Sequence, residues 1–137
     1  MFSKQISVFV ENKKGRLAKI LASLKDNGIN IRALCLADTQ NYGILRFIAS
    51  DTEKAQGVLK NEKMMFNVSD VLTVRMEDEA GSLCEILSVL ALGDIDVEYA
   101  YAFVSKNENE AMAVIRTSDD KAAAEVLKKK GYACQKG

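Results

Sequence analysis

Several residue types on which enzymes and metalloproteins depend are missing from this 137-residue sequence. It contains no histidine, no proline and no tryptophan, and its three cysteines stand far apart with no CxxC pair. The absence of histidine excludes histidine-based acid–base catalysis, Cys-His and Ser-His nucleophile pairs, and histidine-ligated metal sites within the chain. Isolated cysteines inside apolar runs are usually small buried hydrophobic side chains. We therefore predict no catalytic residues, no metal site, no cofactor and no enzymatic activity.

Net charge and long apolar segments are also missing. The 19 basic and 19 acidic residues cancel, which argues against a polyanion-binding or membrane-surface role. No run approaches the ~18 apolar residues that a membrane span needs. The start, MFSKQISVFVENKK, has no basic segment followed by an apolar one, and so no secretory signal. We expect a cytoplasmic protein with no nucleic-acid or membrane partner.

What the sequence does contain is an internal repeat. A shift of 66 residues places ENKKGRLAKIL (11–21) on EDEAGSLCEIL (77–87), and a shift of 68 places ILRFIASD (44–51) on MAVIRTSD (112–119). The two extra residues fall in the polar stretch 105–110, where an exposed loop tolerates insertion. Apolar positions that stay in phase over most of each repeat indicate duplication. We predict two domains, residues 1–69 and 70–137.

Both repeats predict the same order of elements. In the first, an alternating pattern predicts a strand at 5–11 and a helical stripe predicts a helix from 17 to 24. Strands at 29–38 and 42–49, a helix from 51 or 52 through 59, and a short strand at 66–68 follow. The second repeat predicts strands at 71–77, 95–105, 110–117 and 132–135, and helices at 81–92 and 119–130. This order, βαββαβ twice, predicts an α+β fold of two ferredoxin-like units. Since only Ser69-Asp70 separates them, we expect one rigid body, with the two sheets side by side.

The RNA-recognition motif shares this order of elements and is a rival interpretation. It requires a basic surface and aromatic side chains on the open face of the sheet. The three aromatic residues Tyr99, Tyr101 and Phe103 have the same parity as the apolar positions 95 and 97. We therefore predict that they lie in the core.

In both repeats the first strand leads through a polar loop and a glycine into a helix. The first-turn N–H groups of a helix have no intrahelical acceptors, and the helix dipole adds partial positive charge there. A residue without Cβ lets a carboxylate or phosphate approach those amides. The residues alone leave open the alternative that Gly15 and Gly81 only supply an unusual φ for the turn.

These loops and the strands that follow carry a resemblance to a known family. The relevant residues are Val10-Glu11-Asn12, Gly15-Arg16-Leu17 and Gly28-Ile29-Asn30-Ile31, with their counterparts Met76-Glu77-Asp78, Gly81-Ser82-Leu83 and Asp94-Ile95-Asp96-Val97. Together they resemble the ACT domain, a small regulatory module that binds amino acids. Lys14 and Ala80 stand where that family often has proline.

The resemblance implies an amino acid held where two ACT units meet, with the loop of one unit facing the second strand of the other. The implied binding residues are Asn12, Lys13, Lys14, Gly15, Arg16, Leu17, Asn30, Ile31, Asp78, Glu79, Ala80, Gly81, Ser82, Leu83, Asp96 and Val97. A ligand carboxylate suits the amides of residues 12–17 and the bases beside them. An ammonium suits Asp78, Glu79 or Asp96. Because the first loop has KKGR where the second has DEAGS, we expect the two loops to differ in function.

The resemblance implies a free-standing regulatory protein that acts through an unidentified protein partner. Two alternatives remain open. Strand positions that are apolar on both faces favour an assembly module without a small ligand, for instance a homodimer. A small enzyme on a ferredoxin-like fold is the other, because fold does not decide function.

Overall fold

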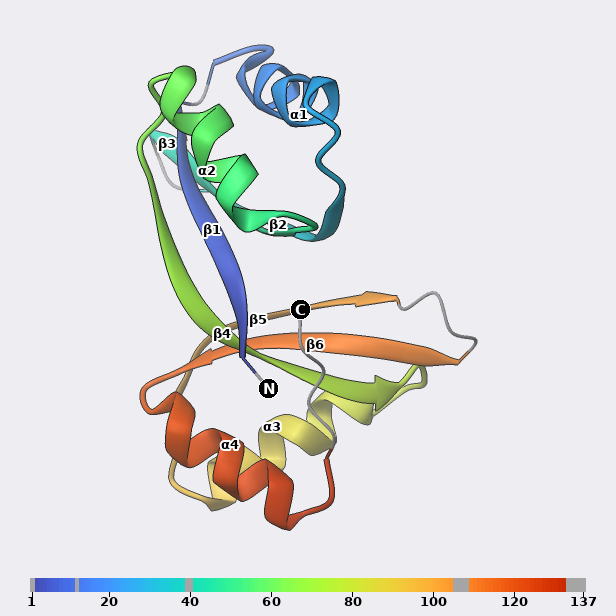
Figure 1. The fold of residues 1–137 in the computed structure, drawn as a ribbon. Coiled ribbons are helices and arrows are strands. Elements are labelled where there is room, and N and C mark those ends of the chain that lie inside the picture. The colour runs from blue at the N-terminus through green and yellow to red at the C-terminus, as the bar shows by residue number, and fades with distance from the viewer. Residues whose placement is uncertain (1, 12, 39–40, 105–108, 133–137) are drawn as a thin grey trace. The chain divides into compact units, whose positions relative to one another are not determined.

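The computed structural model describes residues 2–11, 13–38, 41–104 and 109–132 (Figure 1). The chain forms two compact units. The first unit comprises Lys4–Ser69, and the second begins at Asp70 and also includes Ser3. The predicted α+β class with two ferredoxin-like units is confirmed.

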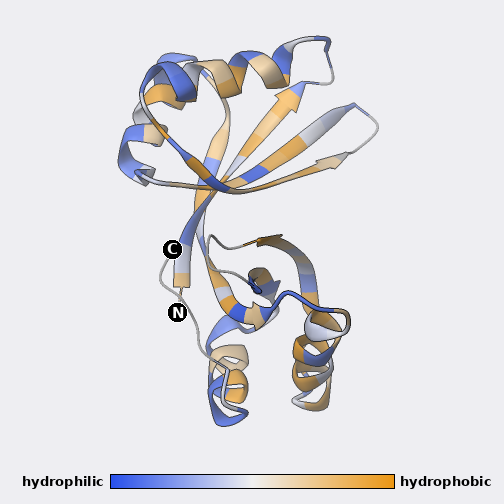
Figure 2. Cartoon of the chain, turned by 90° about the vertical axis from the view of Figure 1, so that its right-hand side faces the viewer, coloured by the Kyte–Doolittle hydropathy of each residue, from blue (hydrophilic) through white to orange (hydrophobic). Residues whose placement is uncertain are grey.

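The first unit places two helices on one face of an antiparallel sheet. Its elements are β1 (Phe2–Glu11), α1 (Arg16–Asp26), β2 (Ile31–Asp38), β3 (Tyr42–Ala49), α2 (Thr52–Asn61) and the start of β4 (Phe66–Glu77). The strand order is β2-β3-β1-β4, and Figure 2 shows both helices on the same side of the strands. The core forms where the inward-facing residues of β1 and β3 meet the helices. It contains Ile6, Val8, Leu45, Phe47, Leu24 and Leu59, each at most 1% exposed.

The second unit repeats this architecture. Its elements are the remainder of β4, α3 (Ser82–Leu92), β5 (Val97–Val104), β6 (Glu110–Thr117) and α4 (Asp120–Lys129). The strand order is β1-β4-β6-β5, where β1 contributes through its first residues. The core is again formed by fully buried side chains of strands and helices: Leu72, Val74, Ile115, Ile86, Leu90 and Leu127.

Strand β4 differs from its predicted form. The strands expected at 66–68 and 71–77 are one strand, and Ser69-Asp70 lie inside it rather than forming a joint. Hydrogen bonding along a sheet uses backbone groups, so two polar side chains do not interrupt a strand. β1 also begins at Phe2 rather than at residue 5. There the Ser3 hydroxyl lies 2.9 Å from the Thr73 hydroxyl, in a buried hydrogen bond. Most of the strand predicted at 132–135 lies outside the described residues.

The prediction that Tyr99, Tyr101 and Phe103 lie in the core is wrong. A register shift between Val97 and Tyr99 interrupts β5, and Tyr101 then pairs with Val114, which is buried but does not belong to the core cluster under the helices. A bulge adds one residue to a strand, so every later side chain changes face. The three aromatic side chains are half-buried on the face away from the helices.

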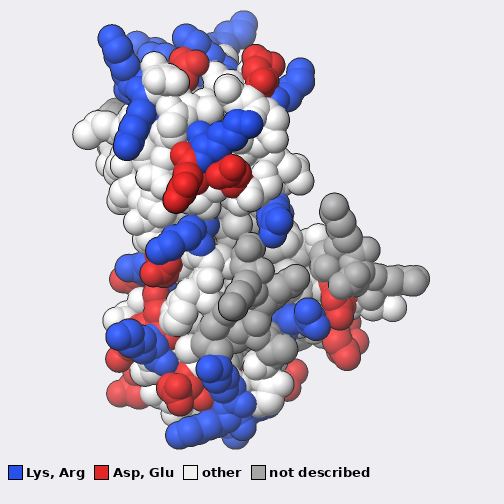
Figure 3. Space-filling model, in the orientation of Figure 1, with Lys and Arg blue, Asp and Glu red and all other residues white. Residues whose placement is uncertain are grey.

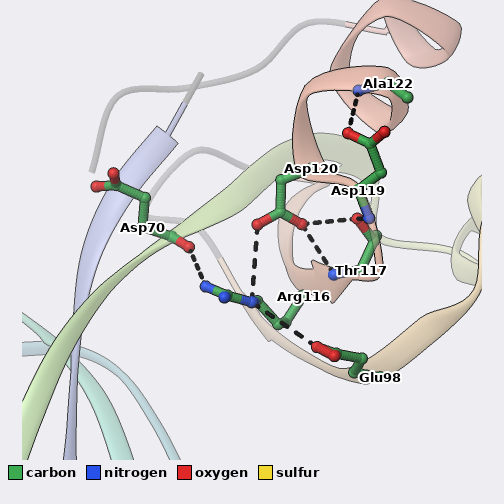
Figure 4. A network of polar contacts seen from close by, with 7 residues as sticks. All are labelled: Asp70, Glu98, Arg116, Thr117, Asp119, Asp120 and Ala122. Carbon is green, nitrogen blue, oxygen red and sulfur yellow. Dashed lines mark hydrogen bonds and ion pairs between the residues drawn. The ribbon is translucent and has the colours of Figure 1, made fainter.

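Arg116 ties three elements of the second unit together (Figure 4). Its Nη1 donates to the backbone carbonyl of Asp70 at 2.9 Å. Its Nε lies 3.8 Å from a carboxylate oxygen of Glu98 and 3.8 Å from one of Asp120. The Asp120 carboxylate also accepts hydrogen bonds from the backbone N–H and the hydroxyl of Thr117. The network joins the start of α4 to β4 and β5. The first unit has Ile48 at the equivalent position.

Candidate functional site

The two glycine loops have the same backbone conformation. Gly15 (φ 82°, ψ −5°) and Gly81 (φ 91°, ψ −13°) are the N-caps of α1 and α3. In both loops the next N–H donates back three residues, from Arg16 to Lys13 at 3.2 Å and from Ser82 to Glu79 at 3.3 Å. An L-residue rarely adopts this left-handed conformation, so the turn itself requires glycine. Among the described residues, apart from the two chain neighbours of each glycine, no heavy atom lies within 4 Å of where a Cβ would stand, so the surface beside the turn is open to a ligand.

The helices after these loops begin differently from the other two. α2 and α4 are capped by aspartate: Asp51 accepts from the N–H of Lys54, and Asp119 from that of Ala122, both at 3.1 Å. α1 and α3 have no side-chain cap. Their first-turn N–H groups therefore keep the capacity to bind an external anion.

The predicted site residues separate into two groups within each unit. The loop residues of the first unit lie at the end of β1 where Glu11 pairs with Tyr42, and the start of β2 lies at the opposite end of β3, where Ile31 pairs with Ala49. The second unit has the same separation, with Glu77 paired to Glu110 and Val97 paired to Thr117. One unit thus brings its loop residues together but does not bring them to Asn30 and Ile31, or to Asp96 and Val97. The predicted pairing of each loop with the second strand of the other unit stays a prediction.

The remaining predicted residues are mostly on the surface. Lys13, Lys14, Asp78, Glu79 and Ala80 are exposed. Leu17 and Leu83 are partly buried against the two cores, so they hold the loops to the units. Asn12 lies outside the described residues.

A groove of about 540 Å³ opens beside the loop of the first unit. It is lined by Phe9, Val10, Glu11, Arg16, Tyr42, Glu62, Lys63, Met64 and Met65. We call it the first groove. Sequence reasoning predicted only Arg16 of these residues. Of the other lining residues, the sequence pointed only to Phe9, which lies between core-facing residues of an alternating strand and therefore faces outward.

A groove of about 580 Å³ lies at the same place in the second unit, and we call it the second groove. It is lined by Arg75, Met76, Glu77, Glu79, Ser82, Glu85, Val89, Glu110, Lys130, Gly131 and Tyr132. The internal repeat pairs the linings position by position: Phe9 with Arg75, Val10 with Met76, Glu11 with Glu77, Arg16 with Ser82, Tyr42 with Glu110, Glu62 with Lys130, Lys63 with Gly131, and Met64 with Tyr132. Duplication thus preserved the groove and changed its chemistry.

The carboxylate at the start of the first loop is paired with two of the loop's bases. The Glu11 carboxylate lies 3.1 Å from Lys13 Nζ and 3.7 Å from Arg16 Nη2. The hydrogen bond and charge of Lys13, followed by the charge of Arg16, lower the pKa of Glu11. Figure 3 shows further Lys and Arg side chains gathered over the helices of the first unit.

The second loop concentrates negative charge. The Glu79 carboxyl, when protonated, donates a hydrogen bond to the Glu77 carboxylate, and this bond together with the charge of Glu77 raises the pKa of Glu79. Burial, followed by the charge of Glu85, raises the pKa of Tyr132. At the equivalent positions of Lys13 and Glu79 the charges are opposite, and the two loops therefore differ in charge, as the sequences KKGR and DEAGS predict.

Within the described ranges, no three His, Cys, Asp or Glu side chains converge to hold a metal ion. No helix among the described residues is long and apolar enough to cross a membrane.

Comparison with known proteins identifies the repeat. The family model described as an ACT domain pair matches residues 1–136. Protein BT0572 from Bacteroides thetaiotaomicron, known from a crystal structure, is 38% identical over 98% of this chain and 92% of its own, with a TM-score of 0.91. The ligand-free regulatory subunit of aspartate kinase from Thermus thermophilus has the same fold at 14% identity, with a TM-score of 0.67 over 92% of this chain and 90% of its own. The corresponding subunit from Thermus flavus has a TM-score of 0.63 at 15% identity, with the same shares covered. No curated protein matches the chain.

Proposed function

The chain belongs to the ACT domain family, as a pair of ACT domains, and we propose that it is a regulatory protein that binds an amino acid at its glycine loops. The observation that carries this proposal is the start of α1 and α3. Both helices begin at a left-handed glycine, lack a side-chain cap and have open space beside the glycine. A helix start of this kind binds a carboxylate through its backbone N–H groups.

The two loops have different parts in this proposal. In the first, the N–H groups of Arg16 and Leu17, with the charged groups of Lys13 and Arg16, receive the ligand carboxylate. In the second, the carboxylates of Asp78 and Glu79, and that of Asp96, suit a ligand ammonium. This assignment is supported by the loop charges and by the opposite pKa directions of Glu11 and Glu79.

A thermal-shift screen against the standard amino acids tests the proposal. A ligand that binds only the folded state raises the melting temperature by an amount that grows with its concentration. We expect one or a few amino acids to do so, and a uniformly flat screen would contradict the proposal. Gly15→Asn is the informative variant, because asparagine tolerates the left-handed conformation and places a side chain in the ligand's path. It should abolish the shift while the variant stays folded.

A second candidate function is self-assembly. Leu34 and Leu36 are 48% and 50% exposed on β2, which is the outer strand in the order β2-β3-β1-β4. An exposed apolar edge strand is a common site of association. Sedimentation of the purified chain tests this candidate: we expect a homodimer that Leu34→Lys dissociates, and a monomer at high concentration would exclude it.

The regulatory output is part of the same proposal. The chain shows no metal-ligand cluster among its described residues, and we propose that it acts in the cytoplasm through a protein partner rather than by catalysis. Affinity capture with and without the amino acid found in the screen tests this point, since only a ligand-dependent partner would support it.

A further inference from the structure

We infer that the first groove selects a small carboxylate with an aromatic or apolar body, and that the second groove does not. This inference rests on the proposed function, because it names the class of ligand that the first unit binds. It concerns the surface between the end of β1 and the segment after α2, which shares Arg16 with the glycine loop.

One wall of the first groove is apolar and exposed. The rings of Phe9 and Tyr42 meet edge to face, with centroids 5.9 Å apart, and are 39% and 42% exposed. Met65 is 75% exposed, and its carbonyl accepts the N–H of Phe9 at 3.0 Å. Two aromatic side chains and a methionine that remain in water at one place mark a binding surface. An aromatic or aliphatic group that covers them removes this apolar area from water.

The other wall carries two cations, Arg16 and Lys63, together with two carboxylates that are already engaged. Glu11 lies 3.1 Å from Lys13 Nζ and 3.7 Å from Arg16 Nη2, and Glu62 accepts a hydrogen bond from the Ser23 hydroxyl at 3.0 Å. The cationic groups are therefore the ones suited to an incoming carboxylate.

Lys63 also occupies a position that disfavours lysine. Its φ is 57°, and its repeat counterpart is Gly131 with φ 87°. A side chain in the left-handed region is strained, whereas glycine adopts this conformation readily. A strained residue that lines a groove indicates a role for its side chain, and here that role is to supply a cation.

The second groove shows that the fold does not require these features. At the positions of Phe9 and Tyr42 it has Arg75 and Glu110, whose Nε and carboxylate oxygen lie 3.9 Å apart. Ser82 replaces Arg16, and Gly131 replaces Lys63. An ion pair thus stands where the first groove has an aromatic pair. The opposite wall keeps one cation, Lys130, but the lining also holds the four carboxylates of Glu77, Glu79, Glu85 and Glu110. A carboxylate with an apolar body therefore loses the aromatic pair there and meets an excess of negative charge.

The methionines provide a direct test, because Met64 and Met65 line the first groove and Met76 lines the second. The full chain, labelled with carbon-13 at the methionine methyl groups, is titrated with 3-phenylpropanoate and followed by NMR. We expect saturable shifts of Met64 and Met65 and none of Met76. Phenethylamine, which has the ring without the carboxylate, and propanoate, which has the carboxylate without the ring, should both bind at least about tenfold more weakly.

Matched variants separate the two walls. Phe9→Ala and Arg16→Gln should each weaken binding of 3-phenylpropanoate by roughly fivefold or more, whereas Arg75→Ala should change it less than twofold. Tyr42→Leu, which keeps an apolar side chain, should weaken binding less than Phe9→Ala does. Each variant is checked for an unchanged methionine spectrum without probe, so a loss of folding is not read as a loss of binding.

The inference is wrong if Met76 moves as much as Met64 and Met65, if no methionine moves, or if Phe9→Ala leaves the affinity unchanged. It is also wrong if Met64 and Met65 shift with protein concentration alone, since a second copy of the chain would then occupy the groove. The thermal-shift screen distinguishes failure of the proposed function from failure of the inference about the first groove. An amino acid whose effect depends on Gly15 but not on Phe9 leaves the proposed function standing and removes this inference, whereas a flat screen with silent methionines removes both.

Discussion

The cores of the two units correspond in sequence: the repeat aligns Leu24 with Leu90, Ile20 with Ile86 and Leu45 with Ala113. The grooves beside the glycine loops correspond in place but not in chemistry. One has an aromatic pair with two cations and two carboxylates, and the other has an ion pair and excess negative charge. Folding constrains the buried positions and the φ of Gly15 and Gly81, and both units have kept these features. The solvent-facing lining is under no such constraint, so the differences there are informative about function.

The left-handed positions show the same division of constraints. After α1 the first unit has Gly28 (φ 70°) where the second has Asp94 (φ 59°), and after α2 it has Lys63 where the second has Gly131. The backbone keeps its conformation at all four positions whether or not the residue is glycine. At these two pairs of positions, each unit therefore holds one strained side chain where its counterpart has glycine.

The largest expected effect tests the equality of the cores. Leu24→Ala and Leu90→Ala remove repeat-related side chains that are both 0% exposed. Each should lower the free energy of unfolding by about 2–5 kcal/mol, from lost burial and the cavity left behind. Urea unfolding measures both. If the two losses in free energy of unfolding differ by more than about 2 kcal/mol, the two cores are not equally packed. The loss depends on how far the surrounding side chains can fill the cavity.

The next effect sharpens the contrast between capped and uncapped helices. Asp51→Ala and Asp119→Ala each remove the side-chain cap of a helix. The cost should be about 0.5–2 kcal/mol of stability, measured by thermal unfolding, with Asp51→Asn as the control that keeps a capping oxygen. If Asp51→Ala leaves the stability unchanged, the side-chain cap does not distinguish α2 from α1.

Exchanging the strained residues should have a similar or smaller effect, in the opposite direction. Lys63→Gly and Asp94→Gly relieve a left-handed side chain, and each should raise the free energy of unfolding by up to about 1 kcal/mol. Gly131→Lys, which introduces the strain into the second unit, should lower it. If Lys63→Gly also weakens binding of 3-phenylpropanoate, the strain serves the groove. Greater stability without that loss would assign the strain no function.

The smallest effects concern pH. The pKa of Glu11 is lowered by Lys13, so its contribution to stability is present above the ordinary value of 4.5 and is lost as pH falls through its lower folded value. The pKa of Glu79 is raised by Glu77, so its penalty applies above the raised value and is relieved as pH falls through it. NMR titration of the side-chain carboxyl carbons should place the midpoint of Glu79 above 4.5 and that of Glu11 below. Glu77→Gln and Lys13→Gln should move the respective midpoints back, and identical midpoints for the two glutamates would contradict the charge contrast.

The sequence predicted what periodicity and turn chemistry determine. The repeat, the helices, most strands and the left-handed glycines follow from local patterns. The continuity of β4 could not be predicted in this way. Ser69 and Asp70 resemble a loop between two strands, and only pairing with a neighbouring strand makes them part of a strand. The side of the sheet on which Tyr99, Tyr101 and Phe103 lie depends on a bulge, and no residue in the sequence indicates that bulge. The groove linings were missed for a related reason: Phe9, Tyr42 and Met65 come from three segments that only the fold brings together.

The two units share one fold, and we propose that their binding surfaces are unequal. The most direct measurement is calorimetric titration of the wild-type chain, Gly15→Asn and Gly81→Asn with the amino acid that gives the largest shift in the thermal screen. Both substitutions place the same side chain at the same left-handed position of matched loops. We predict that Gly15→Asn weakens binding by at least about tenfold and that Gly81→Asn has a much smaller effect. Equal losses from the two substitutions would show that the loops bind alike and would contradict the claim.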